Sequence, residues 1–396
     1  MSVNTLNFEQ SAAILTALTQ QATGQAALAP VNEADFVSMA QTTLRTGYDT
    51  LGTALSVVLS SSIFSSRVYN AQFDGMRYDQ TRWGAITRKI NFLDVDIRED
   101  DRFKLVDGQS VDPFVFRKVK VVQTNFYGGD VWCVDYSILR DQWDQAMTGS
   151  AMFGTFVAGI IQNIMNQIEQ IRENERRMAL QTLIAGTINR GGAIHLLTEY
   201  KDQTGNSTIS ATNWQSEAEF PYFVKWLYGF INTLVDMMGE RNALYHQNIA
   251  TYNGTAVKPI MRHTPRNFMK GYILNSLMKQ IDSSVMSSVF HNEILQTIDF
   301  ETVNYWQSIQ SPASINVTPP VMSNTGEFAV AESAVSNDAV VGVLFDEEAA
   351  GSGTFNEWSD GIWNPRGGYT TFYYHFTTRN FVDYTENAIV LLMDEE

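Results

Sequence analysis

The sequence predicts an α+β fold in which one β-hairpin has no core of its own. Three observations predict it: a highly charged hairpin between Ala85 and Thr124, a long amphipathic helix between Ser150 and Gly186, and apolar strands near the C-terminus. With 396 residues, of which 44 % are hydrophobic, the chain can bury a large core in two or three domains.

The charged hairpin is the most informative stretch. Two strand-like runs, Ile90–Ile97 and Phe114–Gln123, flank a charged middle. Residues 86–121 hold eight Lys or Arg and seven Asp or Glu, whereas 18 % of the whole chain is charged. Because a lone hairpin is at best marginally stable in water, we expect another copy of the chain to hold this one, through charges that face a complementary surface. The residues expected to contact a neighbouring subunit are Arg88, Lys89, Asp94, Asp96, Arg98, Glu99, Asp100, Asp101, Arg102, Lys104, Arg117, Lys118 and Lys120.

The strongest periodic signal begins at Ser150. Apolar residues recur every three to four positions from Phe153 to Ile171, as an amphipathic helix requires. Ser150 is the expected N-cap and Gly186 the expected end, which gives a helix of roughly 50 Å that can form the backbone of one domain. Two ion pairs at helical spacing are expected, Glu169 with Arg172 and Glu173 with Arg177.

The N-terminal 66 residues differ from the rest of the chain. Only four charged residues lie between Ser11 and Ser66, and Ala, Thr, Gln and Ser dominate. Short helices are expected at Ala12–Leu18 and Phe36–Leu44. Since the segment is too rich in small residues for a compact domain and too apolar for a free tail, we expect an extended arm that lies on a neighbour.

The remaining elements follow from local patterns. The apolar run Ala339–Phe345 is typical of a buried central strand, and Asp346 is expected to cap a short helical turn that ends at Gly351. Residues 187–213 and 305–335 are expected to be mostly irregular. The other expected strands are Val131–Tyr136, Val257–Met261, Tyr369–Thr377 and Ala388–Met393, and the other expected helices are Glu219–Gly239 and Thr264–Ile281.

The charge balance argues against a protein that grips nucleic acid. The net charge is −16, and such binding depends on Lys and Arg that neutralise phosphates. Residues 280–365 contain 12 Asp or Glu and no Lys or Arg. This stretch is either a solvated acidic face or a surface that must not adhere to DNA.

Cysteine usage and hydropathy limit the location of the chain. Cys133 is the only cysteine, so no disulfide can form within the chain, and its apolar neighbours predict a small buried side chain. The N-terminus lacks the pattern of a signal peptide, and Leu51–Phe64 is too short and too polar to span a bilayer. We therefore expect a protein of a cytoplasm, or of a particle assembled there, with no membrane contact.

Motifs that carry chemistry are missing from the sequence. No phosphate-binding glycine loop, dinucleotide fingerprint or nucleophile elbow occurs. The five histidines are far apart and are expected to be surface or hydrogen-bonded residues. The acids from Asp94 to Asp101 lack the order of a calcium loop. These observations predict no enzyme activity, no cofactor and no metal site.

Taken in order, the elements resemble the major capsid proteins of tailed bacteriophages, which share the Hong Kong 97 fold. Ala85–Thr124 resembles the extended loop, or E-loop, and Ser150–Gly186 resembles the spine helix. Ala339–Ala350 looks like the central strand and turn of the axial domain, and Thr371–Met393 looks like the return to the peripheral domain. The resemblance covers nearly the whole chain and lies in the order of elements.

The resemblance implies a shell protein without catalytic site or cofactor. In that family, hexamers and pentamers of the subunit tile an icosahedral shell around double-stranded DNA, which is not bound specifically, and the E-loop lies over the neighbouring subunit. Scaffolding, portal and decoration proteins are the implied further partners, and no local pattern selects a lysine and an asparagine for a crosslink. The implied domains are residues 1–66 (arm), 67–84 (connection), 85–124 (E-loop), 125–220 (peripheral domain, with the spine helix at 150–186), 221–363 (axial domain) and 364–396 (returning strands).

Three other readings remain open at this point. An encapsulin-like nanocompartment shell has the same fold, but such proteins are shorter and lack a long arm. A portal protein would be longer and richer in helix, and a tail-tube protein shorter and mostly β. An enzyme without a recognisable motif is the third alternative.

Overall fold

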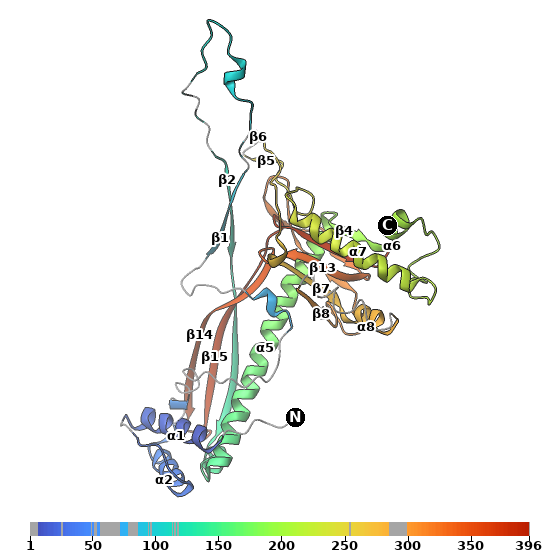
Figure 1. Ribbon diagram of the computed structural model, residues 1–396. Coiled ribbons are helices and arrows are strands. Elements are labelled where there is room, and N and C mark those ends of the chain that lie inside the picture. Colours follow the sequence, from blue (N-terminus) through green and yellow to red (C-terminus); the bar gives the residue numbers. More distant parts are fainter. Residues whose placement is uncertain are drawn as a thin grey trace.

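The computed structural model describes residues 7–24, 27–48, 50, 54–55, 72–77, 86–93, 95, 97–112, 114, 116, 119–252, 255–284 and 299–395. The long helix α5 (Ser150–Asn189) runs through the molecule and joins two bodies of structure (Figure 1). A β-hairpin projects from the region where the two bodies meet (Figure 1). Among the described residues, no helix has both the length and the hydropathy needed to cross a membrane.

The peripheral body is a long antiparallel sheet backed by α5. Its three strands lie in the order β14 (Ala350–Asn364), β15 (Tyr369–Val382) and β3 (Asp130–Leu139). The strand expected at Tyr369–Thr377 therefore continues to Val382, and its buried Phe372 and Phe376 share one face. That face packs against α5, which contacts both β14 and β15.

The axial body contains a five-stranded sheet at the centre of the main core. Every residue of β13 (Val340–Asp346) is buried, and the strand lies in the middle of the sheet, which confirms the expected central strand. The helices beside this sheet are α6 (Leu196–Thr204), α7 (Phe220–Gly239) and α8 (Asn275–Ser284). The order is β4 (Ala193–His195), β16 (Ala388–Leu392), β13, β7 (Met269–Leu274) and β8 (Asp299–Val303).

The N-terminal segment builds a second, smaller core. Its helices α1 (Phe8–Thr23) and α2 (Glu33–Leu44) pack with α4 (Arg140–Ala146) against the first turns of α5 (Figure 1). The rings of Phe36 and Phe153 meet edge to face in this core, with centroids 5.8 Å apart. The expectation of an extended arm is therefore wrong for the described helices, because their apolar faces are buried on their own chain.

The connecting segments contain only short elements. Three-residue strands pair as β9 (Ile315–Val317) with β12 (Val335–Asn337), and as β10 (Pro320–Met322) with β11 (Phe328–Val330). Residues 305–335, which were expected to be mostly irregular, therefore contain β9, β10, β11 and the start of β12, joined by turns and loops. The other short elements are η1 (Asp74–Met76), η2 (Asp101–Lys104), η3 (Arg266–Phe268), β5 (Thr251–Tyr252) and β6 (Thr255–Ala256).

The ends of α5 differ from the expectation. Gly149 is the N-cap, while the Ser150 backbone N–H and hydroxyl both donate to Glu33 of α2. Gly186 does not end the helix. A Cβ atom there would lie 2.2 Å from the ring of Tyr384, so the glycine instead lets this ring lie directly against the helix. Both expected ion pairs of the helix are present, Glu169 with Arg172 and Glu173 with Arg177.

Three segments were given the wrong element by their local pattern. The helix expected at Thr264–Ile281 is instead η3, strand β7 and then α8, because residues 269–274 are enclosed between β13 and β8. The strand expected at Val257–Met261 is absent from these described residues, and the loop expected at 187–213 contains the end of α5, β4 and α6. These are cases in which tertiary packing overrides local preference.

Two smaller expectations are also corrected. The residues after Asp346 form a turn at positions 347–349 without a helix, and Gly351 lies in β14. Cys133 is exposed, because its apolar neighbours alternate across β3 and only one set of them faces α5.

Replacement of Gly186 by alanine tests the contact with Tyr384. We expect Gly186→Ala to lower the free energy of unfolding by about 1–3 kcal/mol, because the added methyl overlaps the ring. Gly159→Ala is the matched control, since a Cβ atom there meets nothing within 4 Å on the same helix. Urea unfolding of the unassembled subunit measures both, and equal effects of the two substitutions would contradict the role given to Gly186.

Candidate assembly interface

The hairpin is a short ladder that carries a long extension. Strands β1 (Ile86–Phe92) and β2 (Val121–Tyr127) pair in antiparallel register from Ile86 with Tyr127 to Phe92 with Val121. The expected strands Ile90–Ile97 and Phe114–Gln123 were therefore placed too close to the turn. Between them, the described residues of 93–120 form no strand and only the short helix η2. We call residues 93–120 the hairpin tip, which extends well beyond the rest of the molecule (Figure 1).

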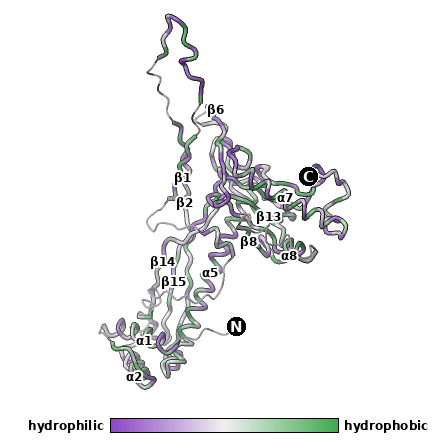
Figure 2. The backbone as a smooth tube through the Cα atoms, in the orientation of Figure 1, coloured by the Kyte–Doolittle hydropathy of each residue, from purple (hydrophilic) through white to green (hydrophobic). Residues whose placement is uncertain are grey.

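The hairpin tip exposes many large apolar side chains. Phe103, Phe114 and Phe116 are 86–88 % exposed, and Ile97 is 96 % exposed. Figure 2 shows hydrophobic stretches along the tip, interspersed with hydrophilic ones. Large exposed apolar patches mark interaction surfaces in soluble proteins. The exposed apolar residues of the tip are Val95, Ile97, Phe103, Leu105, Val106, Val111, Phe114, Phe116 and Val119.

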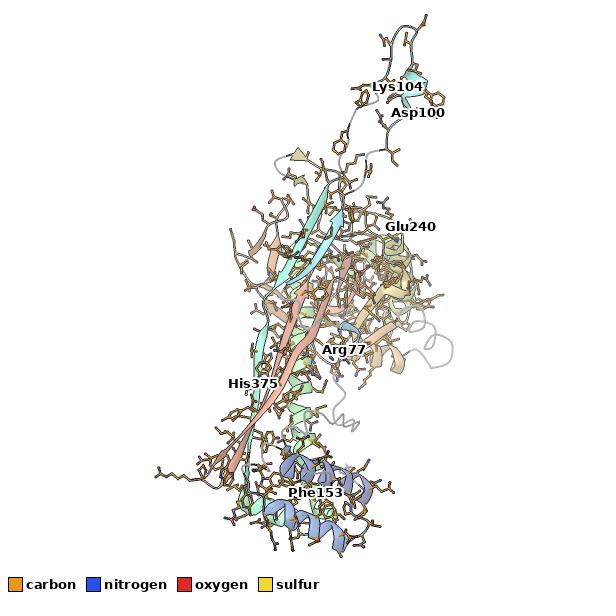
Figure 3. All side chains as sticks on the ribbon, turned by 90° about the vertical axis from the view of Figure 1, so that its left-hand side faces the viewer. Arg77, Asp100, Lys104, Phe153, Glu240 and His375 are labelled. Carbon is orange, nitrogen blue, oxygen red and sulfur yellow. The ribbon has the colours of Figure 1, made fainter. Side chains whose placement is uncertain are left out.

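The charged side chains of the tip pair with one another. Nitrogen–oxygen distances are 2.6 Å for Arg102 with Asp100, 2.8 Å for Arg98 with Asp101 and 3.2 Å for Lys104 with Glu99. Asp100 and Lys104 lie in this part of the tip in Figure 3. Hydrogen bonds from the Arg102 side chain and backbone hold the pKa of Asp100 below its usual value. Exposed pairs of this kind contribute only about 0–1 kcal/mol each, so they shape the tip more than they stabilise it.

Two further described candidates lie near the base of the hairpin, Arg88 on β1 and Lys120 directly before β2. Both side chains are exposed. Asp94, Asp96, Arg117 and Lys118 lie outside the described residues. The structure therefore places six charged candidates together in and around η2, and it places Lys89 elsewhere.

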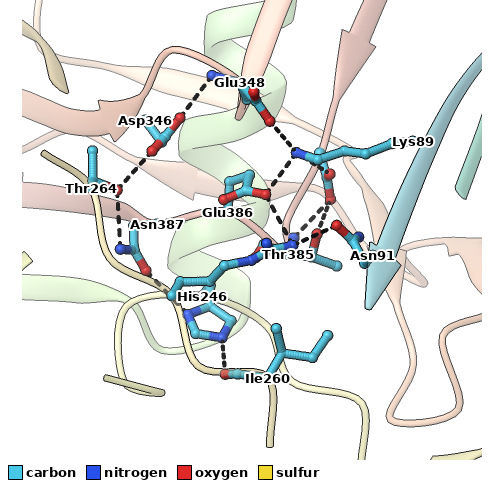
Figure 4. Close-up of polar contacts among 12 residues, drawn as sticks. Lys89, Asn91, His246, Ile260, Thr264, Asp346, Glu348, Thr385, Glu386 and Asn387 are labelled. Carbon is cyan, nitrogen blue, oxygen red and sulfur yellow. Dashed lines mark hydrogen bonds and ion pairs between the residues drawn. The ribbon is translucent and has the colours of Figure 1, made fainter. Parts of the chain in front are cut away.

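Lys89 fixes the root of the hairpin to its own chain. Its ammonium nitrogen lies 2.7 Å from a carboxylate oxygen of Glu386 and 3.1 Å from oxygens of Asp383 and Glu348 (Figure 4). Burial disfavours the charged lysine, but the carboxylates of Asp383 and Glu386 outweigh burial and raise the pKa of Lys89. Within the subunit, β1 therefore turns this side chain inward onto carboxylates of its own chain, and the role between subunits expected for Lys89 stays a prediction.

A second cation completes the cluster at the root. Arg262 lies 3.0 Å from Glu386, donates to the side-chain oxygen of Asn91 at 2.8 Å, and donates to the backbone oxygen of Thr385 at 3.0 Å. Burial raises the pKa of Glu386, although Lys89 and Arg262 oppose that shift. We call Lys89, Asn91, Arg262, Glu348, Asp383 and Glu386 the root cluster (Figure 4).

The root cluster lies where the two bodies meet. Asp383 and Glu386 belong to the turn between β15 of the peripheral sheet and β16 of the axial sheet. The buried His246 also contacts this turn. Its ring nitrogens lie 3.1 Å from the side-chain oxygen of Asn387 and 2.8 Å from the backbone oxygen of Ile260. His246 is thus a hydrogen-bonded core histidine, as expected. The cluster gives the hairpin a fixed origin on the rigid body of the subunit.

Sequence reasoning missed two parts of this arrangement. The high density of charged residues drew attention away from the apolar residues of the tip, although the alternation of Phe114 and Phe116 in the sequence could have indicated them. The partners of Lys89 come from positions nearly 300 residues away, and no local pattern connects them.

The fold defines the class of protein. Two solved structures resemble the chain at a TM-score of 0.55. The first is the capsid structure of Staphylococcus phage Andhra, at 10 % identity, with 85 % of this chain and 88 % of that chain covered. The second is a chain of the structure described as head fiber and inner core protein gp22 of native bacteriophage P68, at 11 % identity, with 84 % of this chain and 87 % of that chain covered. The fold is that of the Hong Kong 97-like phage capsid proteins.

The family model narrows this class. The model for the Phi29-like phage major capsid protein matches residues 12–392, so the chain belongs to that family. It is a structural protein of the phage virion that associates with itself into a capsid shell. No curated protein sequence matches the chain.

Removal of the Lys89 ammonium tests the root cluster. We expect Lys89→Met to lower the free energy of unfolding by about 1–3 kcal/mol, because Asp383 is left buried without its counter-charge. The matched control is Lys104→Met, which removes an exposed pair and should change stability by less than about 0.5 kcal/mol. Urea unfolding measures the loss, and hydrogen exchange should show faster exchange of the β1 amides in Lys89→Met alone. An unchanged exchange rate in β1 would contradict the anchoring role.

Proposed function

We propose that this chain forms hexamers and pentamers that tile an icosahedral phage head, and that the hairpin tip is the element that joins neighbouring subunits. The observation that carries this proposal is the set of apolar side chains that the tip leaves exposed. The proposal also rests on membership in a capsid family.

The energetics favour a contact made by every subunit. Burial of a large apolar side chain contributes about 1.5–3 kcal/mol relative to exposure. A subunit that inserts its tip into one neighbour and receives the tip of another takes part in two such contacts, so a closed ring gains one tip contact per subunit. Such a head-to-tail contact closes into a ring when the rotation between subunits is suitable, which is how cyclic capsomers arise.

The charge of the chain fits a container for DNA. A net charge of −16 leaves little attraction for phosphates, so the genome would be enclosed without specific binding. We further propose assembly in the host cytoplasm with help from separate scaffolding, portal and possibly decoration proteins. In this proposal the chain is a structural subunit of the shell, without catalytic activity and without a cofactor.

Substitution of the three tip phenylalanines tests the joining role. We expect Phe103→Asp, Phe114→Asp and Phe116→Asp together to leave a folded, soluble subunit that forms no shells, because the exposed side chains support no core within the chain. Electron microscopy of the expressed protein measures the outcome.

The matched control replaces the same three residues by leucine, which keeps the apolar surface and should permit shells. Normal shells from the aspartate variant would refute the joining role. Shells that contain a co-purified enzyme in place of DNA would favour the nanocompartment alternative.

A further inference from the structure

The amine of Lys89 is enclosed with two buried carboxyl groups. Its nitrogen is buried, and its side chain as a whole is 19 % exposed. The side chain of Asp383 is 0 % and that of Glu386 is 8 % exposed, whereas Glu348 is 67 % exposed. Burial away from water disfavours the charged forms of an amine and of a carboxyl group. Exchange of protons within this group therefore costs less than it would at the surface.

The two carboxyl oxygens of Asp383 have different surroundings. Oδ1 accepts one hydrogen bond from the backbone N–H of Thr385 at 2.9 Å and another from the Thr385 hydroxyl at 2.7 Å. Oδ2 accepts no hydrogen bond from the described residues, and it lies 3.1 Å from the Lys89 nitrogen. Two donors held on one oxygen stabilise the negative charge that develops there when a nucleophile adds to the carbonyl carbon. The arrangement thus favours attack by the nearby amine on the carboxyl carbon of Asp383.

Glu386 is placed to carry protons between these two groups. Its carboxylate lies 2.7 Å from the Lys89 nitrogen and 3.0 Å from Arg262. An amine is a nucleophile only after it has lost its proton, and the surrounding carboxylates raise the pKa of Lys89, so a proton acceptor in contact with it is required. Burial raises the pKa of Glu386, which makes it a better acceptor than an exposed glutamate.

We propose that Lys89 and Asp383 of the same subunit condense to an amide bond, which ties the root of the hairpin covalently to the turn between β15 and β16. The ion pair between the two side chains is the state from which the bond forms (Figure 4). The proposal does not depend on the joining role of the tip.

The condensation needs no other reactant. Glu386 takes a proton from the ammonium and gives it to Oδ2 of Asp383, and the nitrogen adds to the carboxyl carbon while Oδ1 holds the negative charge beside Thr385. Glu386 then moves a second proton from the nitrogen to Oδ2, which leaves as water. One N–C bond forms and one C–O bond breaks, and the three protons of the ammonium end as one on the amide and two in the water. A cavity of about 480 Å³, lined in part by Lys89 and Glu348, can take up the released water.

The bond changes how the hairpin is held. It closes a loop that contains most of the chain, from β1 to the turn after β15. A covalent link across a long loop stabilises the folded state by restricting the unfolded chain. The position of the root then no longer depends on ion pairs alone, which salt and acid weaken.

Mass spectrometry of the full-length chain tests the bond directly. The denatured chain should be lighter than its sequence by the mass of one water molecule. A tryptic digest should contain residues 89–98 joined to residues 380–396, because trypsin does not cleave at a lysine held in an amide. Fragmentation of the joined peptide should place the bond on Asp383. Absence of the joined peptide from both folded subunits and shells, or a bond on Glu386, would overturn the proposal.

Substitutions separate this bond from other losses of water, such as dehydration at Asp107–Gly108. Lys89→Arg keeps the positive charge but cannot form the bond, and Glu386→Gln removes the proton carrier, so both should have the full mass of their sequences and no joined peptide. Glu347→Gln is the matched control, because this carboxylate lines the same cavity outside the root cluster and the joined peptide should persist. A mass deficit that remains in Lys89→Arg, or a joined peptide in Glu386→Gln, would contradict the proposed step.

A denaturing gel distinguishes a bond within the chain from one between chains. The linked subunit should migrate as a monomer, and faster than Lys89→Arg, because the closed loop keeps the denatured chain more compact. A ladder of linked subunits that carries the joined peptide would overturn the assignment to a single chain. The wild-type mass and digest decide the proposal even if a variant fails to fold.

Discussion

The subunit cannot bury the apolar side chains of its own hairpin tip, and this constraint governs the rest of the structure. Among the described residues from Val95 to Val119, nine large apolar side chains are exposed on a segment without a core. The charges around them pair locally and keep the segment soluble before assembly. Burial of these apolar side chains can therefore contribute free energy only at contacts between subunits.

The remainder of the fold gives the tip a defined direction. Helix α5 supports both sheets, and Tyr384 lies directly on it at Gly186. The turn that contains Tyr384, Asp383–Glu386, also receives Lys89 and Arg262, so the hairpin starts from the junction of the two bodies. The ion pairs at the root position the hairpin, and the apolar tip provides the surface for binding.

Much of this fold was predictable from local patterns. The periodicity of α5, the apolar run of β13 and the order of the elements were enough to indicate a Hong Kong 97-like capsid protein. Local patterns failed where contacts are distant: residues 269–274 became a strand because β13 and β8 enclose them, and Cys133 is exposed because only alternate residues of β3 face α5. The root cluster joins residues nearly 300 positions apart, so no reading of neighbours could find it.

Hydrogen exchange of the tip, compared between free subunits and assembled shells, tests the central claim most directly. Residues 97–112 have few hydrogen bonds within the subunit and should exchange rapidly when the subunit is free. The account predicts strong protection of these amides in the shell, where a neighbouring copy covers them. Exchange that is equally fast in shells and in free subunits would show that the tip stays in solvent, and would contradict the claim that it joins the subunits.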